Sequence, residues 1–239
     1  MTATFSLNLL GGFELRHDRI AVQLQPQARR VIAFLALQDR PSQRSTVAES
    51  LWPDRALPLS RSSLRSALFH IARRAEGLIE LRPTTLALSA DVSIDVRKLG
   101  DTEPTEDVST GELLPEMGDE WLAFERERCR QRQVRALETR CRLLADARCF
   151  ERAIEAGLRL TQLEPYRETA HRALIEAHLS EGNVGDAVRV YRQFESRLRC
   201  ELDISPTASL IALLGPALNM AGTADRLCRT ARDRSAESP

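Results

Sequence analysis

Lysine is almost absent from this sequence. Lys98 is the only lysine among 239 residues, so the remaining basic side chains are arginines. A nucleotide-binding phosphate loop needs a lysine beside a glycine-rich turn, and Schiff-base catalysis needs a buried lysine. Lys98 follows Val96 and Arg97 without such a turn. Both chemistries are therefore excluded.

Long apolar segments are missing as well. No apolar run approaches the roughly 18 to 20 residues that span a bilayer. Residues 1–10 have neither a basic start nor a small-residue cleavage site, so they do not resemble a signal peptide. We therefore expect a cytoplasmic protein without membrane contact. The cysteines are odd in number and lie at no metal-ligand spacing, which favours reduced thiols at Cys129, Cys141, Cys149, Cys200 and Cys228.

Enzyme motifs are also lacking. There is no nucleophile elbow, no HExxH and no paired Cys-His signature. His171 and His178 are seven residues apart and share a helical face, but a metal site needs more than two ligands, so packing or solvation is favoured over metal binding. We expect no enzyme, no cofactor and no metal.

The charges that are present are divided unevenly. Net charge is zero, but residues 1–98 hold 14 basic and 9 acidic side chains, and the remainder holds 20 and 25. The N-terminal part thus carries +5 and the rest −5. Such asymmetry suggests that the N-terminal part meets a polyanion, although a solvated surface can also produce it.

Alternating apolar residues predict a small antiparallel sheet over 5–9, 13–15 and 20–24. A buried helix is predicted over 29–38, with Pro26 at its first turn. Ser45 is the expected N-cap of a second helix, which ends where Trp52 meets Pro53. A third helix is predicted over 60–76, capped by Ser60 and stopped by Gly77.

The third helix is predicted to have one packed and one free face. At about 100° per residue, Leu64, Leu68, Ile71 and Ala75 form one stripe. The opposite face holds Ser62, Ser66, Phe69 and Arg73. Behind this helix, residues 78–82 and 86–88 read as two strands around a turn at 83–85, with Val92, Ile94 and Val96 alternating beyond. This pattern indicates a hairpin wing.

The remainder is predicted to be helical. Residues 99–112 have the polar, acidic composition of a linker, so we expect domains at 1–98 and 113–220 and a disordered tail at 221–239. An offset of 34 residues, the tetratricopeptide period, aligns Phe150, Ala153 and Ile154 with Val184, Ala187 and Val188. Pro165 then falls at the closing proline of the repeat, where the second copy has Arg199.

Four segments together resemble the Streptomyces antibiotic regulatory protein family, in which an OmpR-type winged helix precedes a bacterial transcriptional activator domain. They are LWPD at 51–54, SSLRSALFHIARR at 62–74, LEPYRETAHRALIEAH at 163–178 and LRCELDISPTASL at 198–210. Asp203 departs from the family glycine at that position. The chain resembles a short member without the NTPase region, and because no receiver domain is recognised in it, we do not expect phosphorelay control within this chain.

The resemblance implies a mixed fold: an α+β winged helix-turn-helix of the OmpR/PhoB type, followed by an all-α tetratricopeptide-like domain. It also implies that helix 60–76 enters the major groove of double-stranded DNA at promoter repeats, that the protein binds as a homodimer, and that the helical domain contacts RNA polymerase or another partner. The free helix face suits phosphates and base edges.

The candidate DNA-binding residues fall into three groups. Arginine donates in bidentate fashion to guanine, so the expected base readers are Arg61, Arg65 and Arg73. The same face adds Ser62, Ser66 and Phe69, and His70 beside it is a candidate for a phosphate or a base. Backbone phosphates are the expected partners of Arg74, Arg44 and Ser45, the last two because a helix N-terminus presents free N–H groups. The wing tip, with Arg82, Thr84 and Thr85, is placed for an adjacent minor groove or its backbone.

Other interpretations remain open at this point. An arginine-rich outer face is often only a solvated surface, and His70 is equally suited to a surface role. Phe69 is an exposed group, a second packing contact or a thymine-methyl contact. The chain is alternatively a peptide-binding module whose winged helix does not bind DNA. Trp121 and Phe124 are expected to fasten the linker end to the helical core, and Tyr166 and Tyr191 to pack or to line a groove.

Overall fold

The structure is a computed structural model that describes residues 5–99 and 110–215. The described chain divides into two compact units, whose boundary falls between Gln133 and Val134. The N-terminal unit comprises 5–99 and 110–133, and the C-terminal unit comprises 134–215. None of the helices in these ranges is long and apolar enough to cross a bilayer. The expected tail at 221–239 and most of the expected linker lie outside the described residues.

The N-terminal unit opens with the predicted antiparallel strands, which are β1 (Phe5–Asn8), β2 (Glu14–His17) and β3 (Ile20–Ala21). A fourth strand, β7 (Ser93–Ile94), pairs in parallel with β1, so the sheet order is β3-β2-β1-β7. Val92, Ile94 and Val96 are buried in alternation as expected, but Val96 does not extend the strand. It belongs to the short helix α4 (Asp95–Lys98), because the Asp95 carboxylate accepts bonds from the backbone N–H groups of Leu9, Leu10 and Val96.

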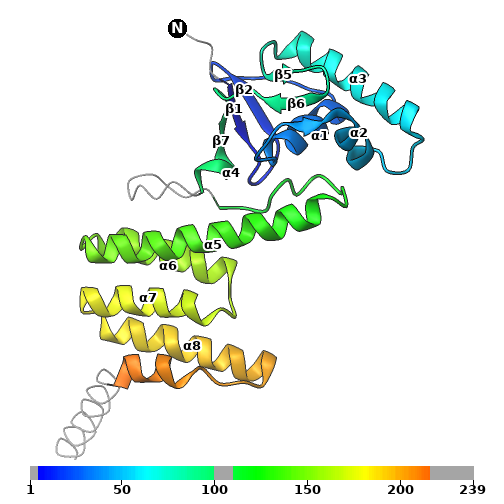
Figure 1. Ribbon diagram of the computed structural model, residues 1–239. Coiled ribbons are helices and arrows are strands. Elements are labelled where there is room, and N and C mark those ends of the chain that lie inside the picture. The colour runs from blue at the N-terminus through cyan, green and yellow to red at the C-terminus, as the bar shows by residue number, and fades with distance from the viewer. Residues whose placement is uncertain (1–4, 100–109, 216–239) are drawn as a thin grey trace, which may run out of the picture. The chain divides into compact units, whose positions relative to one another are not determined.

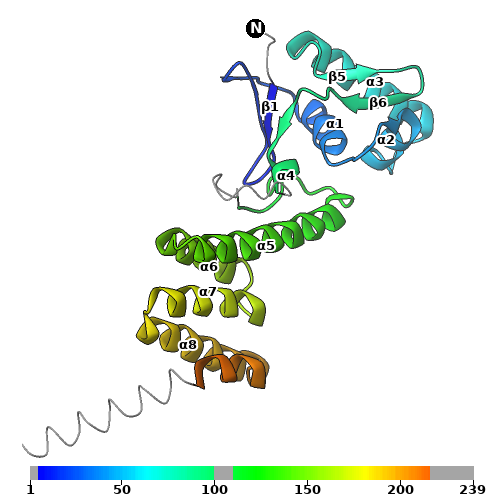
Figure 2. The same cartoon turned by 60° about the vertical axis from the view of Figure 1, so that its left-hand side comes forward.

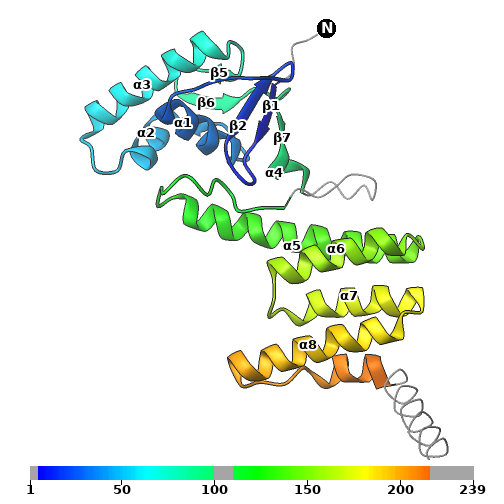
Figure 3. The ribbon, with the colours of Figure 1, turned by 180° about the vertical axis from the view of Figure 1, so that it is seen from behind.

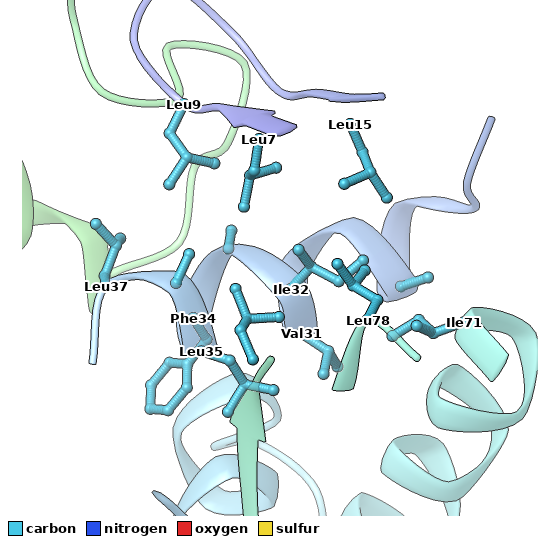
Figure 4. Close-up of a cluster of buried hydrophobic side chains, with 14 of the residues drawn as sticks. Leu7, Leu9, Leu15, Val31, Ile32, Phe34, Leu35, Leu37, Ile71 and Leu78 are labelled. Carbon is cyan, nitrogen blue, oxygen red and sulfur yellow. The ribbon is translucent and has the colours of Figure 1, made fainter. Parts of the chain in front are cut away.

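Three helices follow the first strands. They are α1 (Pro26–Ala36), α2 (Arg44–Leu51) and α3 (Leu57–Arg74). Figure 4 shows Leu7 and Leu15 of the strands pointing toward α1, which buries Val31, Ile32 and Leu35 in return. A sheet with one apolar face needs such a partner. The core therefore lies between the sheet and α1, with α3 packed on the same helix.

Two expected helix caps are wrong. The N-cap of α2 is Gln43, and Ser45 lies in the first turn without a capping hydrogen bond. Helix α3 begins at Leu57, three residues before Ser60, because Pro58 favours the first turn of a helix. Its ring fixes a helical φ, and the N–H that proline lacks would have no partner within the first turn. The Ser60 hydroxyl is buried and donates to the carbonyl oxygens of Trp52 and Arg55 at 3.2 Å.

The predicted wing is present as a hairpin of β5 (Ile79–Leu81) and β6 (Thr85–Leu88). A third strand, β4 (Ser42–Gln43), was not predicted from the sequence and pairs with β6 to give the order β4-β6-β5. This pairing joins the start of α2 to the wing. Figures 1, 2 and 3 all show the hairpin beside α3.

Residues 110–133 belong to the compact N-terminal unit. Leu113, Leu114, Met117 and Leu122 are buried in its core, and the Leu114 N–H donates to the Leu9 carbonyl at 2.9 Å. The Arg126 guanidinium holds this segment by donating to the carbonyls of residues 113, 114 and 117. Strands, helices and this segment thus share one core.

The two aromatic residues of this segment do not fasten it to the helical core as expected. The Trp121 ring meets Phe34 of α1 edge-on, with ring centroids 5.1 Å apart, and packs against the N-terminal core. Phe124 is 73% exposed. The sequence indicated that Trp121 is an anchor, but not which core it enters.

The C-terminal unit is helical, as predicted. Its helices are the second half of α5 (Leu122–Asp146), α6 (Phe150–Leu163), α7 (Glu168–Glu181) and α8 (Val184–Leu202). A further short helix follows at 208–215. Figures 1 and 3 show α6, α7 and α8 side by side in sequence order. The predicted repeat is observed, because Phe150 and Val184 are the first residues of α6 and α8. Pro165 follows the end of α6, whereas Arg199 lets α8 continue to Leu202.

Gly157 marks the closest approach of α6 and α7. A Cβ at this position would lie 2.9 Å from Leu174 Cδ1 and 3.1 Å from Leu174 Cα. Gly157→Ala is therefore expected to destabilise the protein by about 1–3 kcal/mol, because the overpacking outweighs the better helix propensity. Thermal unfolding measures this effect. Gly185→Ala on α8, where nothing lies within 4 Å, is the matched control, and equal unfolding of both variants would contradict the close approach.

Asp203, the departure from the family glycine, ends α8 in a left-handed conformation with φ of 54°. Such a backbone is strained for any residue with a Cβ and is free for glycine. Asp203→Gly is expected to stabilise the protein by about 1 kcal/mol. Denaturant unfolding checks this prediction. A lower midpoint denaturant concentration for the glycine variant than for the wild type would contradict the explanation.

Candidate nucleic-acid interface

The two faces of α3 separate as the sequence predicted. Leu64, Leu68 and Ile71 are buried together with Ala67 and, just past the helix, Ala75. The opposite face is open to solvent. Its exposed side chains are Arg61, Ser62, Arg65, Ser66, Phe69, His70, Arg73 and Arg74. Helix α3 therefore presents a long polar and cationic surface on a firmly packed support.

Within the described residues, the positive charge of this surface is not neutralised by acidic partners. Among the described residues, Arg61, Arg65, Arg73 and Arg74 have no ion-pair or hydrogen-bond partner. Other arginines of the same unit differ, since Arg30 pairs with Asp119 and Arg126 with backbone carbonyls. Four free guanidinium groups on one helix are suited to bind phosphates and guanine bases.

Phe69 lies within this cationic face. Its side chain is 61% exposed, and the guanidinium carbon of Arg73 is 5.9 Å from its ring centroid. The ring of His70 meets it edge-on at 6.1 Å. Of the interpretations left open by the sequence, a second core contact is therefore excluded. An exposed aromatic beside free arginines provides an apolar surface for a base or its methyl group.

The structure brings the wing tip and the start of α2 together. The Arg44 N–H donates to the Thr84 carbonyl at 2.9 Å, and Arg44 Nε donates to the Arg82 carbonyl at 3.2 Å. Ser45 follows in the first turn of α2, and Thr85 begins β6. Arg82 also forms an exposed ion pair with Glu80 at 3.2 Å. Such a pair is weak in water and exchanges readily for a phosphate.

A hollow of about 680 Å³ lies beside the C-terminal part of α3. His70, Arg73 and Arg74 line it on one side, and Gln23 to Gln25 line the other. The sequence pattern did not single out the glutamines, because they lie far from α3 in the chain and precede a different helix, α1. Their amides add donors and acceptors to a cationic edge.

The expected absence of a metal centre concerns His171 and His178 first. Both are buried, and the His171 ring stacks on Phe194 with centroids 4.0 Å apart. In the described ranges there is no group of three or more His, Cys, Asp or Glu side chains that could hold a metal ion. The two histidines pack within the helical unit, as the sequence analysis favoured.

The fold and this surface define a class of protein: a winged helix-turn-helix of the OmpR type followed by an all-helical, tetratricopeptide-like domain. Residues 107–215 match the family described as the bacterial transcriptional activator domain. The N-terminal unit has the elements of a winged helix-turn-helix: helices α1, α2 and α3, a supporting sheet and a hairpin wing.

Two known proteins are similar over most of the chain. The regulatory protein AfsR of Streptomyces coelicolor is 27% identical over 90% of this chain, and the chain spans a quarter of its length. EmbR of Mycobacterium tuberculosis, solved in complex with a low-affinity phosphopeptide, has the same fold with a TM-score of 0.67, at 20% identity over 91% of this chain and 66% of its own. Residues 107–215 thus match the bacterial transcriptional activator domain, and the chain as a whole is similar to transcriptional regulators of the AfsR type.

Proposed function

We propose that this protein is a sequence-specific DNA-binding activator of transcription that works in the cytoplasm. Helix α3 reads the major groove, and the helical domain contacts RNA polymerase or a partner protein. The observation that carries the proposal is the exposed face of α3, where four guanidinium groups without an ion-pair or hydrogen-bond partner among the described residues accompany hydroxyl, imidazole and phenyl groups. A cationic surface of this kind is suited to a polyanion.

Base recognition falls to the middle of this face. Arg61, Arg65 and Arg73 donate to guanine O6 and N7, each good pair discriminating by about 1 to 3 kcal/mol. Ser62, Ser66 and His70 add shorter-range hydrogen bonds to bases or phosphates. Phe69 contacts a thymine methyl group, with Arg73 held over its ring.

Contacts to the DNA backbone position α3 from both of its sides. Arg74 meets a phosphate, and Gln23 and Gln25 in the neighbouring hollow assist it. Arg44 and Ser45 meet a second phosphate at the N-terminus of α2. Arg82, Thr84 and Thr85 at the wing tip reach the adjacent minor groove or its backbone. Two protomers occupy repeated half-sites of a promoter, one turn of DNA apart.

Selection from genomic DNA tests this proposal. The full-length protein is mixed with fragmented genomic DNA at two salt concentrations, and the retained DNA is sequenced. If the proposal holds, the protein enriches a repeated DNA sequence, and its affinity for that DNA falls steeply with salt concentration because phosphate contacts release counterions. Retention of no DNA, with salt-insensitive binding to a protein alone, would favour the alternative of a peptide-binding module.

A further inference from the structure

The C-terminal unit contains a hollow that the DNA-binding proposal does not use. It has a volume of about 510 Å³ and lies among α6, α7 and α8, near the turn that joins α6 to α7. Its apolar lining comes from Leu158, Leu174, Val190 and Phe194. Leu158 remains 47% exposed at the rim. This size falls within the range of about 300–1,000 Å³ that is typical of small-molecule sites.

The two charged groups that line the hollow differ in how they are satisfied. The Glu201 carboxylate accepts a hydrogen bond from the Tyr166 hydroxyl, which raises the pKa of that tyrosine. Arg197, one helical turn earlier on α8, has no ion-pair or hydrogen-bond partner among the described residues. The negative charge is therefore held in place by a donor, while the positive charge is free to meet a ligand.

His171 adds a buried polar group to the same wall. Its side chain is 6% exposed, its ring stacks on Phe194, and its Nε2 lies 3.0 Å from the Pro165 carbonyl oxygen. Burial lowers the pKa of His171, and Nε2 is the nitrogen that donates because its partner is a carbonyl oxygen. The other nitrogen, Nδ1, is a buried acceptor without a partner among the described residues.

We propose that this hollow binds a small amphipathic organic anion. An aromatic or aliphatic body lies on Leu158, Val190 and Phe194, and a carboxylate or sulfonate group meets Arg197. A concave surface that combines apolar side chains with a few polar groups is the usual composition of a small-ligand site, and here Arg197 is the charged group without a partner among the described residues. The proposal is independent of DNA binding, because every residue it uses lies in the C-terminal unit.

The test uses 8-anilinonaphthalene-1-sulfonate, a fluorescent aromatic anion, titrated into the full-length protein. We expect one saturable site. Arg197→Gln should weaken it about five- to tenfold, because a charge-assisted contact becomes a neutral one. Leu158→Asp, which places a carboxylate at the exposed rim, should abolish it. Arg192→Gln is the matched control, since Arg192 is exposed on the same helix and does not line the hollow.

Thermal unfolding of each variant distinguishes loss of the binding site from loss of the fold. All three substitutions replace exposed side chains, so the melting temperature should stay nearly unchanged. Weaker binding in Arg197→Gln and Leu158→Asp, with Arg192→Gln like the wild type, supports the site. Binding that is unsaturable, or equal in all four proteins, would overturn it.

Discussion

Replacing Arg65 and Arg73 together by alanine is expected to weaken binding to the selected DNA site by at least about thirtyfold, since each bidentate contact to guanine discriminates by about 1 to 3 kcal/mol. Both side chains are exposed on α3 and have no partner among the described residues except the Phe69 ring beneath Arg73. Their removal therefore leaves no buried charge behind and should not unfold the domain. Fluorescence anisotropy with labelled site DNA measures the loss.

The matched control removes two exposed arginines elsewhere. Arg189 and Arg199 on α8 are each 68% exposed in their side chains, and both belong to ion pairs within that helix. The double alanine variant Arg189→Ala, Arg199→Ala removes the same formal charge from the C-terminal unit and should bind site DNA within about twofold of the wild type, as expected for distant surface changes. Equal losses in both double variants would mean that overall charge, not α3, governs binding.

A fragment that ends at residue 98 is expected to melt at least about 15 °C below a fragment that ends at residue 133. The shorter fragment contains every strand and helix of the expected winged-helix domain. It lacks Leu113, Leu114, Met117 and Leu122, which are buried in the same core. Fully burying one such side chain contributes about 1.5–3 kcal/mol, against a total stability of about 5–15 kcal/mol for a domain. Circular dichroism melting of the two fragments checks this.

Point variants in the longer fragment give this prediction its control. Leu114→Ala should cost about 2–5 kcal/mol, because Leu114 is completely buried. Phe124→Ala should cost less than about 0.5 kcal/mol, because Phe124 is largely exposed. If the two fragments melt together, residues 110–133 are a separable linker end, and the expected boundary within 99–112 describes the stable domain.

Features that depend on local periodicity were predictable from the sequence. The buried stripe of α3 and its free face follow from a repeat of about 3.6 residues, and both are observed at the positions named. The wing follows from two short alternating runs around Pro83. The 34-residue repeat also follows from the chain alone, since α6 and α8 start at equivalent positions.

Features that depend on distant partners were not predictable in the same way. Strand β4 is two residues long and exists because β6, some 40 residues later, offers it hydrogen bonds. Trp121 is recognisable as an anchor, but only the fold shows that its neighbour is Phe34. Ser60 has the composition of a cap, yet its hydroxyl meets the carbonyls of the preceding loop. A sequence shows which residues can donate or accept hydrogen bonds, but it does not show which distant residue will be the partner.

The roles assigned to individual DNA-binding residues remain predictions, and methylation interference on the selected site tests their central claim most directly. Methylation of guanine N7 blocks the major groove, and methylation of adenine N3 blocks the minor groove. The account predicts that N7 methylation at specific guanines of each half-site prevents wild-type binding, and that Arg65→Ala, Arg73→Ala loses its sensitivity at those guanines. Binding that ignores N7 methylation throughout the site, while it responds to adenine N3, would contradict the reading of the major groove by α3.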